Sequence, residues 1–518
     1  MYAKARIVAL FASISIATAY AADWPQYYGP RRDSTSTEKG LLRAWPNEGP
    51  KVLWTVPLGR GFAGPAISRG KVYLLDRDDT VGDVLRVYDV ATGKELWNFA
   101  YDAPGTFEFP GSRSTPTVDG NIVYIAGPIG DLHAIDINTH KPLWRKNIWR
   151  DFGGGAAFIP ALRRGGGAPA PPRGQAGPPT APPAGQAVPP PAGQAAPPPA
   201  GQAAPPPGQA GPPAAPRGAQ GAAPPAAAGG QRGGSPFGAD GIYGGATTFP
   251  MWGITQNPLV FRTLVIVASQ APEASVVAYD KLTGELKWKA ARLGNTSFVS
   301  PSLVKVGAED HLVMITAAQG QGRNASGGSV NGLDPLTGKV LWTYTGFQCW
   351  IPVAHAVDAG QGRFLMTGGY RAGSAMIKVQ KRADGGYEVT ELFKNPDFGT
   401  HTQPPILYKD HFYVQYTTNE RSDGLVCMTM TGEVKWKTAE EPPFNKGGAI
   451  LADGLLLATD GNTKLYLIEP DPAGFKPLAS AVLLEPANNW APLALVDGKL
   501  LIRDQKQLKV LQVAQRGR

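Results

Sequence analysis

Residues 89–97 read Asp-Val-Ala-Thr-Gly-Lys-Glu-Leu-Trp, a tight turn that leads into a short strand ending in tryptophan. The pattern Asp-x-x-Thr-Gly-x-x-x-Trp recurs along the chain in two full and two partial copies. These are residues 280–288 and 334–342 in full, 136–144 with His140 in the glycine position, and 428–436 with Met428 in the aspartate position. Trp97 and Trp144 are 47 residues apart, and Trp342 and Trp436 are twice that distance apart. The chain therefore contains an internal repeat of a length typical of propeller blades.

A second feature marks the same units independently of the tryptophan. Each unit begins with an apolar run that follows a proline or, once, a glycine. The eight starts are Pro65, Pro116, Pro258, Pro301, Pro352, Pro405, Gly448 and Pro492. Asp-Gly pairs at 119–120, 453–454 and 497–498 lie between β-rich runs, as two-residue hairpin turns require. The sequence predicts an all-β, eight-bladed β-propeller of four-stranded antiparallel blades.

The two ends of the chain predict how the ring closes. Residues 51–55 nearly repeat residues 339–343, although no blade precedes them. The last unit, which ends near residue 513, lacks its own Thr-Gly and tryptophan strand. We therefore expect residues 51–57 to form the outermost strand of the last blade, beside residues 509–512. Closure of this kind protects a propeller from edge-to-edge pairing.

Six tryptophans occupy the same position in the repeat, and we expect them to be structural. They are Trp54, Trp97, Trp144, Trp288, Trp342 and Trp436. Such a ring can be buried between blades while its N–H finds a backbone partner. The glycine of the turn tolerates positive φ, and the threonine hydroxyl can bond to the local backbone.

At these residues the chain resembles the pyrroloquinoline quinone (PQQ) repeat family of quinoprotein-like β-propellers and its tryptophan-docking motif. The segment Asp23-Trp-Pro-Gln-Tyr-Tyr-Gly-Pro30 is similar to the leading segment of exported bacterial PQQ-like repeat proteins. The family includes quinoprotein alcohol dehydrogenases and, more distantly, the lipoprotein that assists outer-membrane protein assembly. The resemblance covers about residues 23–152 and 240–513. It implies the fold strongly and the activity weakly, because one fold hosts many functions.

Residues 1–21 have the pattern of a cleaved signal peptide: Lys4 and Arg6, then a short apolar run, then Ala19-Tyr20-Ala21. The apolar run is shorter than the about 20 residues that span a bilayer, so we expect periplasmic or secreted protein without a transmembrane span. The net charge of +9 is concentrated in this leader and in the insert described next. The remaining chain is close to neutral, which argues against nucleic-acid binding.

Residues 153–239 are rich in proline, alanine, glycine and glutamine, and Ala-Gly-Gln-Ala recurs at 184, 192 and 200. Such a segment buries too little apolar surface to offset its ordering entropy, and we expect a disordered insert. The resulting organisation is signal peptide 1–21, N-terminal extension 22–50, propeller 51–152, insert 153–239, propeller 240–513 and tail 514–518.

Several chemistries lack a sequence signal. The six histidines form neither an i, i+4 pair nor an H-E-x-x-H motif, so we expect no metal site. No G-x-S-x-G elbow and no phosphate-binding glycine loop is present. Cys349 and Cys427 are expected to be buried small residues and not a disulfide. We therefore assign no catalytic residue and no cofactor-binding residue.

The positions just before each unit start are more informative, because innermost propeller strands begin at one mouth of the central channel. The candidate ligand residues there are Arg60, Arg113, Gln256, Asn257, Trp350, His355, Thr402, Gln403, Lys446 and Trp490. Asn445 and Asn489 lie in the same positions. This set is rich in donors and aromatic rings and poor in carboxylates. It fits either a solvated channel rim or a site for an anionic ligand or peptide.

Two functions from different classes remain. The first is a non-catalytic binding or scaffold protein of the cell envelope, a monomeric propeller without cofactor whose partners are envelope proteins or peptides. The second is a PQQ- and Ca²⁺-dependent quinoprotein dehydrogenase that oxidises an alcohol or sugar. The resemblance implies that a dehydrogenase would carry an adjacent Cys-Cys pair, whereas Cys349 and Cys427 are 78 residues apart. A calcium site would also need carboxylates, and only Glu108 and Asp76 come near. A carbohydrate- or peptide-binding module of a secreted degradation system is a third alternative.

Overall fold

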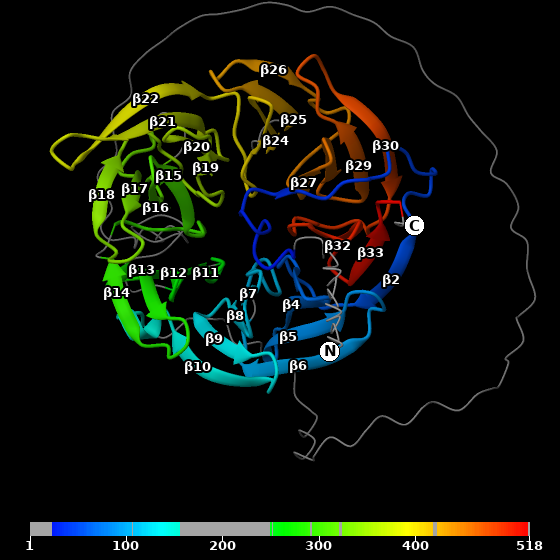
Figure 1. The fold of residues 1–518 in the computed structure, drawn as a ribbon, viewed down its shortest axis with the longest axis horizontal. Coiled ribbons are helices and arrows are strands. Elements are labelled where there is room, and N and C mark those ends of the chain that lie inside the picture. The colour runs from blue at the N-terminus through cyan, green and yellow to red at the C-terminus, as the bar shows by residue number, and fades with distance from the viewer. Residues whose placement is uncertain are drawn as a thin grey trace, which may run out of the picture. The chain divides into compact units, whose positions relative to one another are not determined.

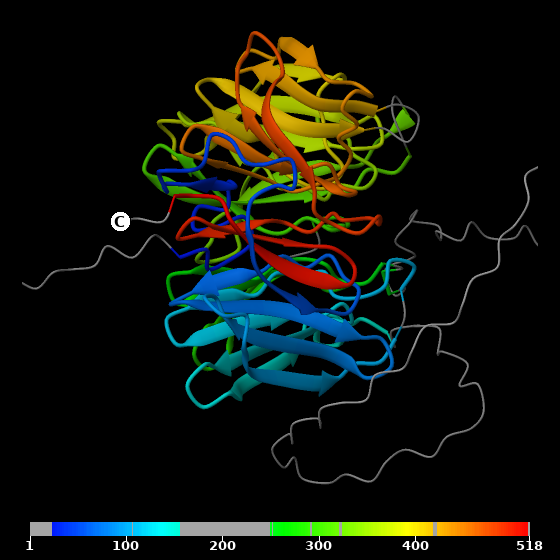
Figure 2. The ribbon, with the colours of Figure 1, turned by 90° about the vertical axis from the view of Figure 1, so that its right-hand side faces the viewer.

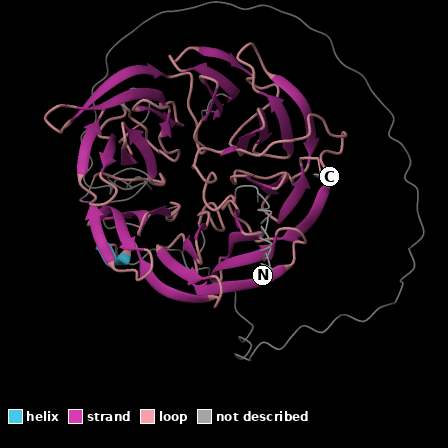
Figure 3. Ribbon diagram, in the orientation of Figure 1, coloured by secondary structure: helices cyan, strands magenta, loops and turns pink. Residues whose placement is uncertain are grey.

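The computed structural model describes residues 23–105, 107–155, 249–250, 252–290, 293–320, 324–417 and 422–515. Over these residues almost all regular structure is strand, arranged as eight antiparallel sheets around a central channel (Figures 1 and 3). A 3₁₀ turn, η1 (Arg150–Phe152), follows the second sheet. The prediction of an eight-bladed propeller is confirmed.

Each blade is a meander whose strands run from the channel to the periphery. Blades one and two are β3 (Ala66–Ser68), β4 (Lys71–Asp78), β5 (Gly82–Asp89), β6 (Glu95–Asp102), and β7 (Thr117–Asp119), β8 (Ile122–Ala126), β9 (Asp131–Asp136), β10 (Lys141–Asn147). Blades three and four are β11 (Leu259–Phe261), β12 (Leu264–Ala271), β13 (Ala274–Asp280), β14 (Leu286–Ala290), and β15 (Ser302–Val306), β16 (Glu309–Thr316), β17 (Ser329–Leu333), β18 (Val340–Tyr344).

The second half of the ring repeats this order. Blades five and six are β19 (Val357–Asp358), β20 (Arg363–Gly368), β21 (Gly373–Lys381), β22 (Tyr387–Asn395), and β23 (Ile406–Tyr408), β24 (His411–Thr417), β25 (Ser422–Thr429), β26 (Val434–Lys437). Blades seven and eight are β27 (Ala449–Ala452), β28 (Leu455–Thr459), β29 (Lys464–Glu469), β30 (Lys476–Val482), and β31 (Ala494–Val496), β32 (Lys499–Arg503), β33 (Gln507–Gln512), β2 (Val52–Pro57).

Burial follows the position of a strand within its blade. All five residues of β8 are buried, whereas β6, at the periphery, alternates between half-buried and exposed residues. Middle strands are covered on both faces by neighbouring blades, so they consist of continuous apolar runs. In outer strands, less and more exposed residues alternate with a period of two, as in a sheet that has one face in solvent. The core therefore lies between blades and not inside any single one.

The Thr-Gly turns are stabilised locally. Asp89 Oδ1 accepts hydrogen bonds from the backbone N–H and the hydroxyl of Thr92, both at 2.8 Å. Gly93 adopts φ +74°, and a Cβ there would come within 2.7 Å of the Trp54 ring of the preceding blade. The turn therefore requires glycine both for its backbone conformation and for the close approach of the neighbouring tryptophan.

The repeat tryptophans join consecutive blades at the periphery. Trp54, Trp144 and Trp436 donate their indole N–H to backbone carbonyls of the following blade, at 3.0, 3.2 and 2.8 Å. Trp342 donates instead to His311 Nδ1 at 2.9 Å. Trp97 stacks at 4.4 Å on His140, the residue that replaces glycine in the weak copy. A histidine is accommodated there because its own ring provides the stacking surface.

The N-terminal strand closes the ring. β2 pairs antiparallel with β33, with Trp54 opposite Val510 and Thr55 opposite Lys509, and completes the blade that begins with β31. The predicted closure is confirmed. The strand order β2-β33-β32-β31 places the first strand of the ring at the outer edge of its last blade.

The residues before β2 were expected to be an extension of the propeller, and the structure places them across the channel. β1 (Thr35–Ser36) pairs in parallel with β27, the innermost strand of blade seven. In Figure 1 this dark blue segment crosses the middle of the ring, and in the edge view it lies toward one face (Figure 2). The channel is therefore not an open bore over the described residues.

Two predicted segments lie outside the described residues: the signal peptide 1–21, and the insert 153–239 apart from 153–155. Residues 516–518 of the predicted tail also lie outside them. In the part of the chain that the structure describes, no helix is long and apolar enough to cross a membrane.

Candidate functional site

A cup-shaped pocket lies at one mouth of the channel, with a volume of about 330 Å³. We call it the aromatic cup. Its wall is built from the connections that lead from the outermost strand of one blade to the innermost strand of the next, and each of the eight connections contributes at least one residue. The lining residues are Tyr27, Tyr28, Phe62, Phe109, Arg113, Trp252, Thr255, Asn257, Phe298, Ile351, Val353, Tyr370, His401, Thr402, Lys446, Trp490 and Pro492.

A continuous belt of aromatic rings forms about half of the wall. Ring centroids are 5.5 Å apart between Trp490 and Phe62, 6.1 Å between Phe62 and Phe109, and 5.6 Å between Phe109 and Trp252. Phe298 continues the belt 5.3 Å beyond Trp252. Such a wall offers large apolar area with little side-chain entropy to lose, which suits a flat ligand.

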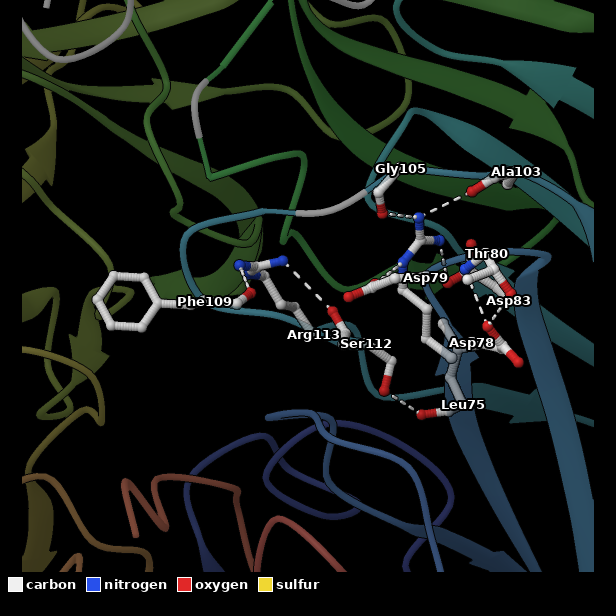
Figure 4. Close-up of polar contacts among 12 residues, drawn as sticks. Leu75, Asp78, Asp79, Thr80, Asp83, Ala103, Gly105, Phe109, Ser112 and Arg113 are labelled. Carbon is white, nitrogen blue, oxygen red and sulfur yellow. Dashed lines mark hydrogen bonds and ion pairs between the residues drawn. The ribbon is translucent and has the colours of Figure 1, made fainter. Parts of the chain in front are cut away.

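Two cations face this apolar wall without a carboxylate partner among the described residues. The Arg113 guanidinium donates to the carbonyl of Phe109 (Figure 4) and to that of Gly111. It also lies 5.1 Å from the Phe107 ring. Burial lowers the pKa of Arg113 to about 9. Lys446 Nζ lies 4.9 Å from the Trp490 ring centroid, and burial also lowers the pKa of this lysine. Each charge is thus partly shielded from water.

The neighbouring Arg77 shows what a compensated guanidinium looks like in the same region. Arg77 Nη1 lies 3.0 Å from Asp83 Oδ1, and Arg77 Nε lies 2.9 Å from Asp79 Oδ1. Arg77 Nη2 donates to the carbonyls of Ala103 and Gly105, both labelled in Figure 4. Because Arg77 already holds both aspartates, they are engaged away from Arg113.

The floor of the cup comes from the N-terminal segment. Tyr27 and Tyr28 are both almost fully buried, and their hydroxyl oxygens are hydrogen-bonded to each other at 3.0 Å. Burial raises the pKa of Tyr27 to about 12 and that of Tyr28 well above its ordinary value. Both phenols are therefore neutral at physiological pH.

His401 adds an imidazole to the polar side chains of the interior. It is 5 % exposed, and its Nε2 has no hydrogen-bond partner among the described residues. Its ring meets Tyr370 edge-on at 4.7 Å, and Nδ1 lies 3.3 Å from the Thr417 hydroxyl. Burial, together with Lys446, lowers the pKa of His401 to about 3, so the imidazole is neutral and can donate or accept one bond.

Five of the ten candidate residues from the sequence line the cup. They are Arg113, Asn257, Thr402, Lys446 and Trp490. Their shared position, just before an innermost strand, is what brings them together. Asn257 is also structural, since its amide contacts Ser300 Oγ at 2.9 Å and bonds the backbone N–H of Thr115.

The other five candidates lie elsewhere, each for a physical reason. Arg60 lies in a separate polar pocket beside Asp76 and Arg86. Gln256 is buried and donates to the Ser297 carbonyl. Trp350 packs edge-on behind Tyr370 at 5.4 Å.

Gln403 lies in a small cavity below the cup and accepts a hydrogen bond from the Ala449 N–H at 3.2 Å. His355 follows the unit start Pro352, but β19 begins only at Val357, so His355 precedes the strand. Its Nε2 donates to the Arg32 carbonyl at 2.9 Å, beneath the floor. In that position it supports the N-terminal segment.

Sequence reasoning missed most of the aromatic lining. Phe62, Phe109, Trp252 and Phe298 lie in four successive connections, between three and seven residues before a unit start. A search for one aromatic or cationic residue per connection would have found them, and His401 and Lys446 as well. Tyr27 and Tyr28 had no such signal, because nothing in the repeat indicates that the N-terminal segment enters the channel.

A calcium-bound quinone cofactor would need its metal ligands from the residues that line the aromatic cup. Calcium takes six to eight oxygen ligands, normally including carboxylates. Among the described residues no carboxylate lines the cup, and Glu108 Oε2 accepts a hydrogen bond from Trp252 Nε1 at 2.7 Å on the exposed side of that ring. The described residues contain no group of three His, Cys, Asp or Glu side chains that could hold a metal ion. Cys349 and Cys427 are buried and not joined. These residues do not fit a calcium-bound cofactor.

Comparisons with known proteins agree with the repeat. A sequence family described as outer membrane protein assembly factor BamB matches residues 30–164 and 246–347. No curated protein matches the chain. A quinohemoprotein alcohol dehydrogenase from Comamonas testosteroni is similar in structure, with a TM-score of 0.54 and 12% identity over 96% of this chain and 81% of that one.

A europium-containing methanol dehydrogenase gives a TM-score of 0.55 and 12% identity, over 95% of this chain and 89% of that one. BamB from Moraxella catarrhalis gives a TM-score of 0.48 and 11% identity, over 90% of this chain and all of that one. At these identities the likeness to the two dehydrogenases concerns the fold alone.

Proposed function

We propose that this chain, a β-propeller that a PQQ-repeat family model matches over residues 30–164 and 246–347, is a non-catalytic binding protein of the cell envelope whose binding site is the aromatic cup. The ligand is a small molecule or peptide end that carries a negative charge on a flat apolar body. The envelope location rests on the signal-peptide pattern of residues 1–21 and on the description of the matching family.

The observation that carries this proposal is the pair Arg113 and Lys446, two cations partly shielded from water in an apolar cup without a carboxylate partner among the described residues. A buried charge without a partner is costly, and an anion entering the cup would relieve that cost at both residues. The aromatic belt would at the same time bury the rest of the ligand. Neutral His401 can bond a polar group on the ligand without adding charge.

The alternative, a quinoprotein dehydrogenase, needs a calcium cage and a base close to the substrate hydroxyl. The cup offers no carboxylate, and its histidine, His401, is held neutral with a pKa of about 3. A base with so low a pKa is weak at neutral pH. We therefore favour binding without turnover, and the assay below includes the dehydrogenase as one of its outcomes.

The test uses a matched pair of probes, 8-anilinonaphthalene-1-sulfonate (ANS) and N-phenyl-1-naphthylamine, which share their rings and differ in the sulfonate. We expect one molecule of ANS to bind per chain, followed by its fluorescence. Arg113→Gln and Lys446→Gln should each weaken ANS by about 10-fold to 100-fold, the range for a bond to a charged group, and leave the neutral probe nearly unchanged.

Lys435→Gln serves as the control, because this lysine pairs with Glu433 at the periphery, at 3.1 Å. Equal loss of both probes in the cup variants would contradict the anion site. The same protein is then titrated with PQQ and Ca²⁺ and assayed for dye reduction with a panel of alcohols and sugars. Turnover that chelation of calcium abolishes would establish the dehydrogenase in place of our proposal.

A further inference from the structure

The N-terminal segment, residues 23–36, contacts the inner edge of most of the ring. Trp24 forms a two-way backbone bridge with Ile67 of β3, with hydrogen bonds of 3.0 and 2.7 Å. The Pro25 carbonyl accepts a hydrogen bond from the N–H of Val118 in β7 at 2.8 Å. β1, at the other end of the segment, lies beside β27. Blades one, two and seven are thus joined through the channel by one short stretch of chain.

Arg32 extends this contact to three more blades. Its guanidinium donates to the carbonyls of Pro258 and Pro301, each at 3.2 Å, directly before the innermost strands of blades three and four. Its own carbonyl accepts the bond from His355, before the innermost strand of blade five. Arg32 is 6 % exposed and has no carboxylate partner among the described residues. The guanidinium is held by carbonyl oxygens, and Arg32 Nε has no hydrogen-bond partner among the described residues. Such a group is costly to bury and is held by geometry, so it positions the chain around it.

The backbone of the segment is wound into an unusual conformation. Tyr28, Arg32 and Ser34 all have φ between +58° and +60°, a region that is strained for residues other than glycine. Gly29, at φ +83°, lies against the Trp24 ring, where a Cβ would come within 2.9 Å. Strain of this kind persists only where the surroundings impose it, and it clusters at functional sites.

The strained turn presents Tyr27 and Tyr28 to the interior of the cup. Their two hydroxyls bond to each other, and one bond uses only one of the two hydroxyl hydrogens. The second hydrogen has no acceptor among the described residues, although Tyr28 is 2 % exposed. Because buried hydroxyl groups are normally hydrogen-bonded, this donor indicates that a bound molecule supplies its acceptor.

We infer that residues 23–36 are part of the binding site, with the Tyr27–Tyr28 pair donating a hydrogen bond to the buried end of the ligand and Arg32 as the residue that positions the pair. This inference rests on the proposed function. It adds two properties: the channel is blind, so the ligand enters and leaves by one mouth, and the preferred ligand has a hydrogen-bond acceptor at its buried end as well as a charge near Arg113 and Lys446.

The first experiment measures this preference in the full-length mature protein. Naphthalene-2-sulfonate and naphthalene-2,6-disulfonate compete with bound ANS, and only the second has acceptors at both ends. We expect wild type to prefer the disulfonate, and Tyr27→Phe/Tyr28→Phe to lose about fivefold to tenfold of that preference, because only the two hydroxyls are removed. The part of the disulfonate preference that depends on charge should remain in this double variant, since Arg113 and Lys446 are intact.

The second experiment follows amide hydrogen exchange in residues 24–36. We expect ANS to slow exchange there, and Arg32→Met to speed it and to weaken ANS by about tenfold. Arg31→Gln is the matched control: Arg31 is adjacent, its side chain is 52% exposed, and it pairs with Asp33 on the surface. This control should change neither exchange nor affinity.

The two proposals fail in different ways. If ANS binding responds to Arg113→Gln and Lys446→Gln, but the preference survives in the double phenylalanine variant and exchange in 24–36 is unchanged by ANS, the floor is structural and this inference is wrong. If neither Arg113→Gln nor Lys446→Gln changes ANS affinity, the proposed function is wrong, and the inference that rests on it is wrong as well.

Discussion

The periphery of the ring and the channel mouth are built by opposite rules. At the periphery Trp54, Trp144 and Trp288 each rest on the turn glycine of the next blade, and the same Asp, Thr and Gly return each time. At the mouth every connection differs: Phe62, Arg113, Trp252 and Lys446 come from four connections of different sequence. Repetition stabilises the ring because every blade interface has the same task. A site for a ligand needs chemically different side chains that approach from different directions, and an exact sequence repeat cannot provide them.

The largest expected effect comes from the one segment that serves both regions. Deleting residues 22–57 removes β2 from the last blade and the floor from the cup. We expect the cooperative melting transition to be lost or lowered by well over 10 °C, because a blade edge is opened and the contacts of Arg32 are lost. Thermal unfolding followed by circular dichroism tests this. A truncated chain that melts with the full-length protein would show that the ring does not depend on its closing strand.

A pair of tryptophan substitutions separates periphery from mouth. Trp288→Ala should destabilise the protein by about 3–5 kcal/mol, the usual range for a large buried ring, since Trp288 is 8 % exposed and packs on Gly338. Trp252→Ala should cost much less stability and weaken ANS instead, because Trp252 lines the cup. Urea unfolding and ANS titration of both variants give the comparison. Equal stability losses, or equal affinity losses, would remove the distinction between the two regions.

The pH dependence of ANS binding sharpens the assignment of the mouth. His401 has a pKa of about 3 and Tyr27 one of about 12, so neither changes charge between pH 5 and 8, and affinity should be flat there. Burial lowers the pKa of Lys446, so its charge is lost at lower pH than that of an exposed lysine. Affinity should therefore fall on the alkaline side, where Arg113, whose pKa burial lowers to about 9, also loses its charge. In Lys446→Gln the alkaline fall should be reduced; an unchanged profile would exclude this lysine from the site.

The smallest effect is expected from shortening the proline-, alanine-, glycine- and glutamine-rich insert. Replacing residues 163–233 with a short Gly-Ser linker should leave the melting temperature within a few degrees, since the entropy of a loop changes only slowly with its length. ANS affinity should also stay within about twofold of wild type, because the lining residues Trp252 and Thr255 are retained. A large drop in melting temperature would show that the insert contributes to the stability of the ring.

Prediction from sequence worked where a feature is local or repeated. Asp89, Thr92 and Gly93 form their turn from contacts within a few residues, so the same letters return wherever the same turn is needed. The duplicate of residues 339–343 at 51–55 was enough to predict the closing strand, because a missing strand in one unit and a spare strand elsewhere have one simple solution.

The candidate site was predicted only in part. The rule that residues before the unit starts converge predicted Arg113, Lys446 and Trp490 to lie together, and all three line the cup. The same rule placed His355 and Gln256 in the site, whereas both point into the protein and bond to backbone carbonyls. Which side of a connection faces the channel depends on how the whole connection is folded, and a spacing argument carries no information about it.

The amino-acid sequence by itself determined the eight blades, the strand that closes them and the tryptophans that join them, because these depend on short-range turns and on a repeated pattern of apolar residues. Only the tertiary structure decided the candidate site. The Tyr27–Tyr28 floor and the Arg32 contacts join residues more than 200 positions apart, and the aromatic cup exists only where eight unlike connections meet. No local sequence pattern predicts how these connections converge, because their arrangement is set by the closure of the ring and not by any one of its blades.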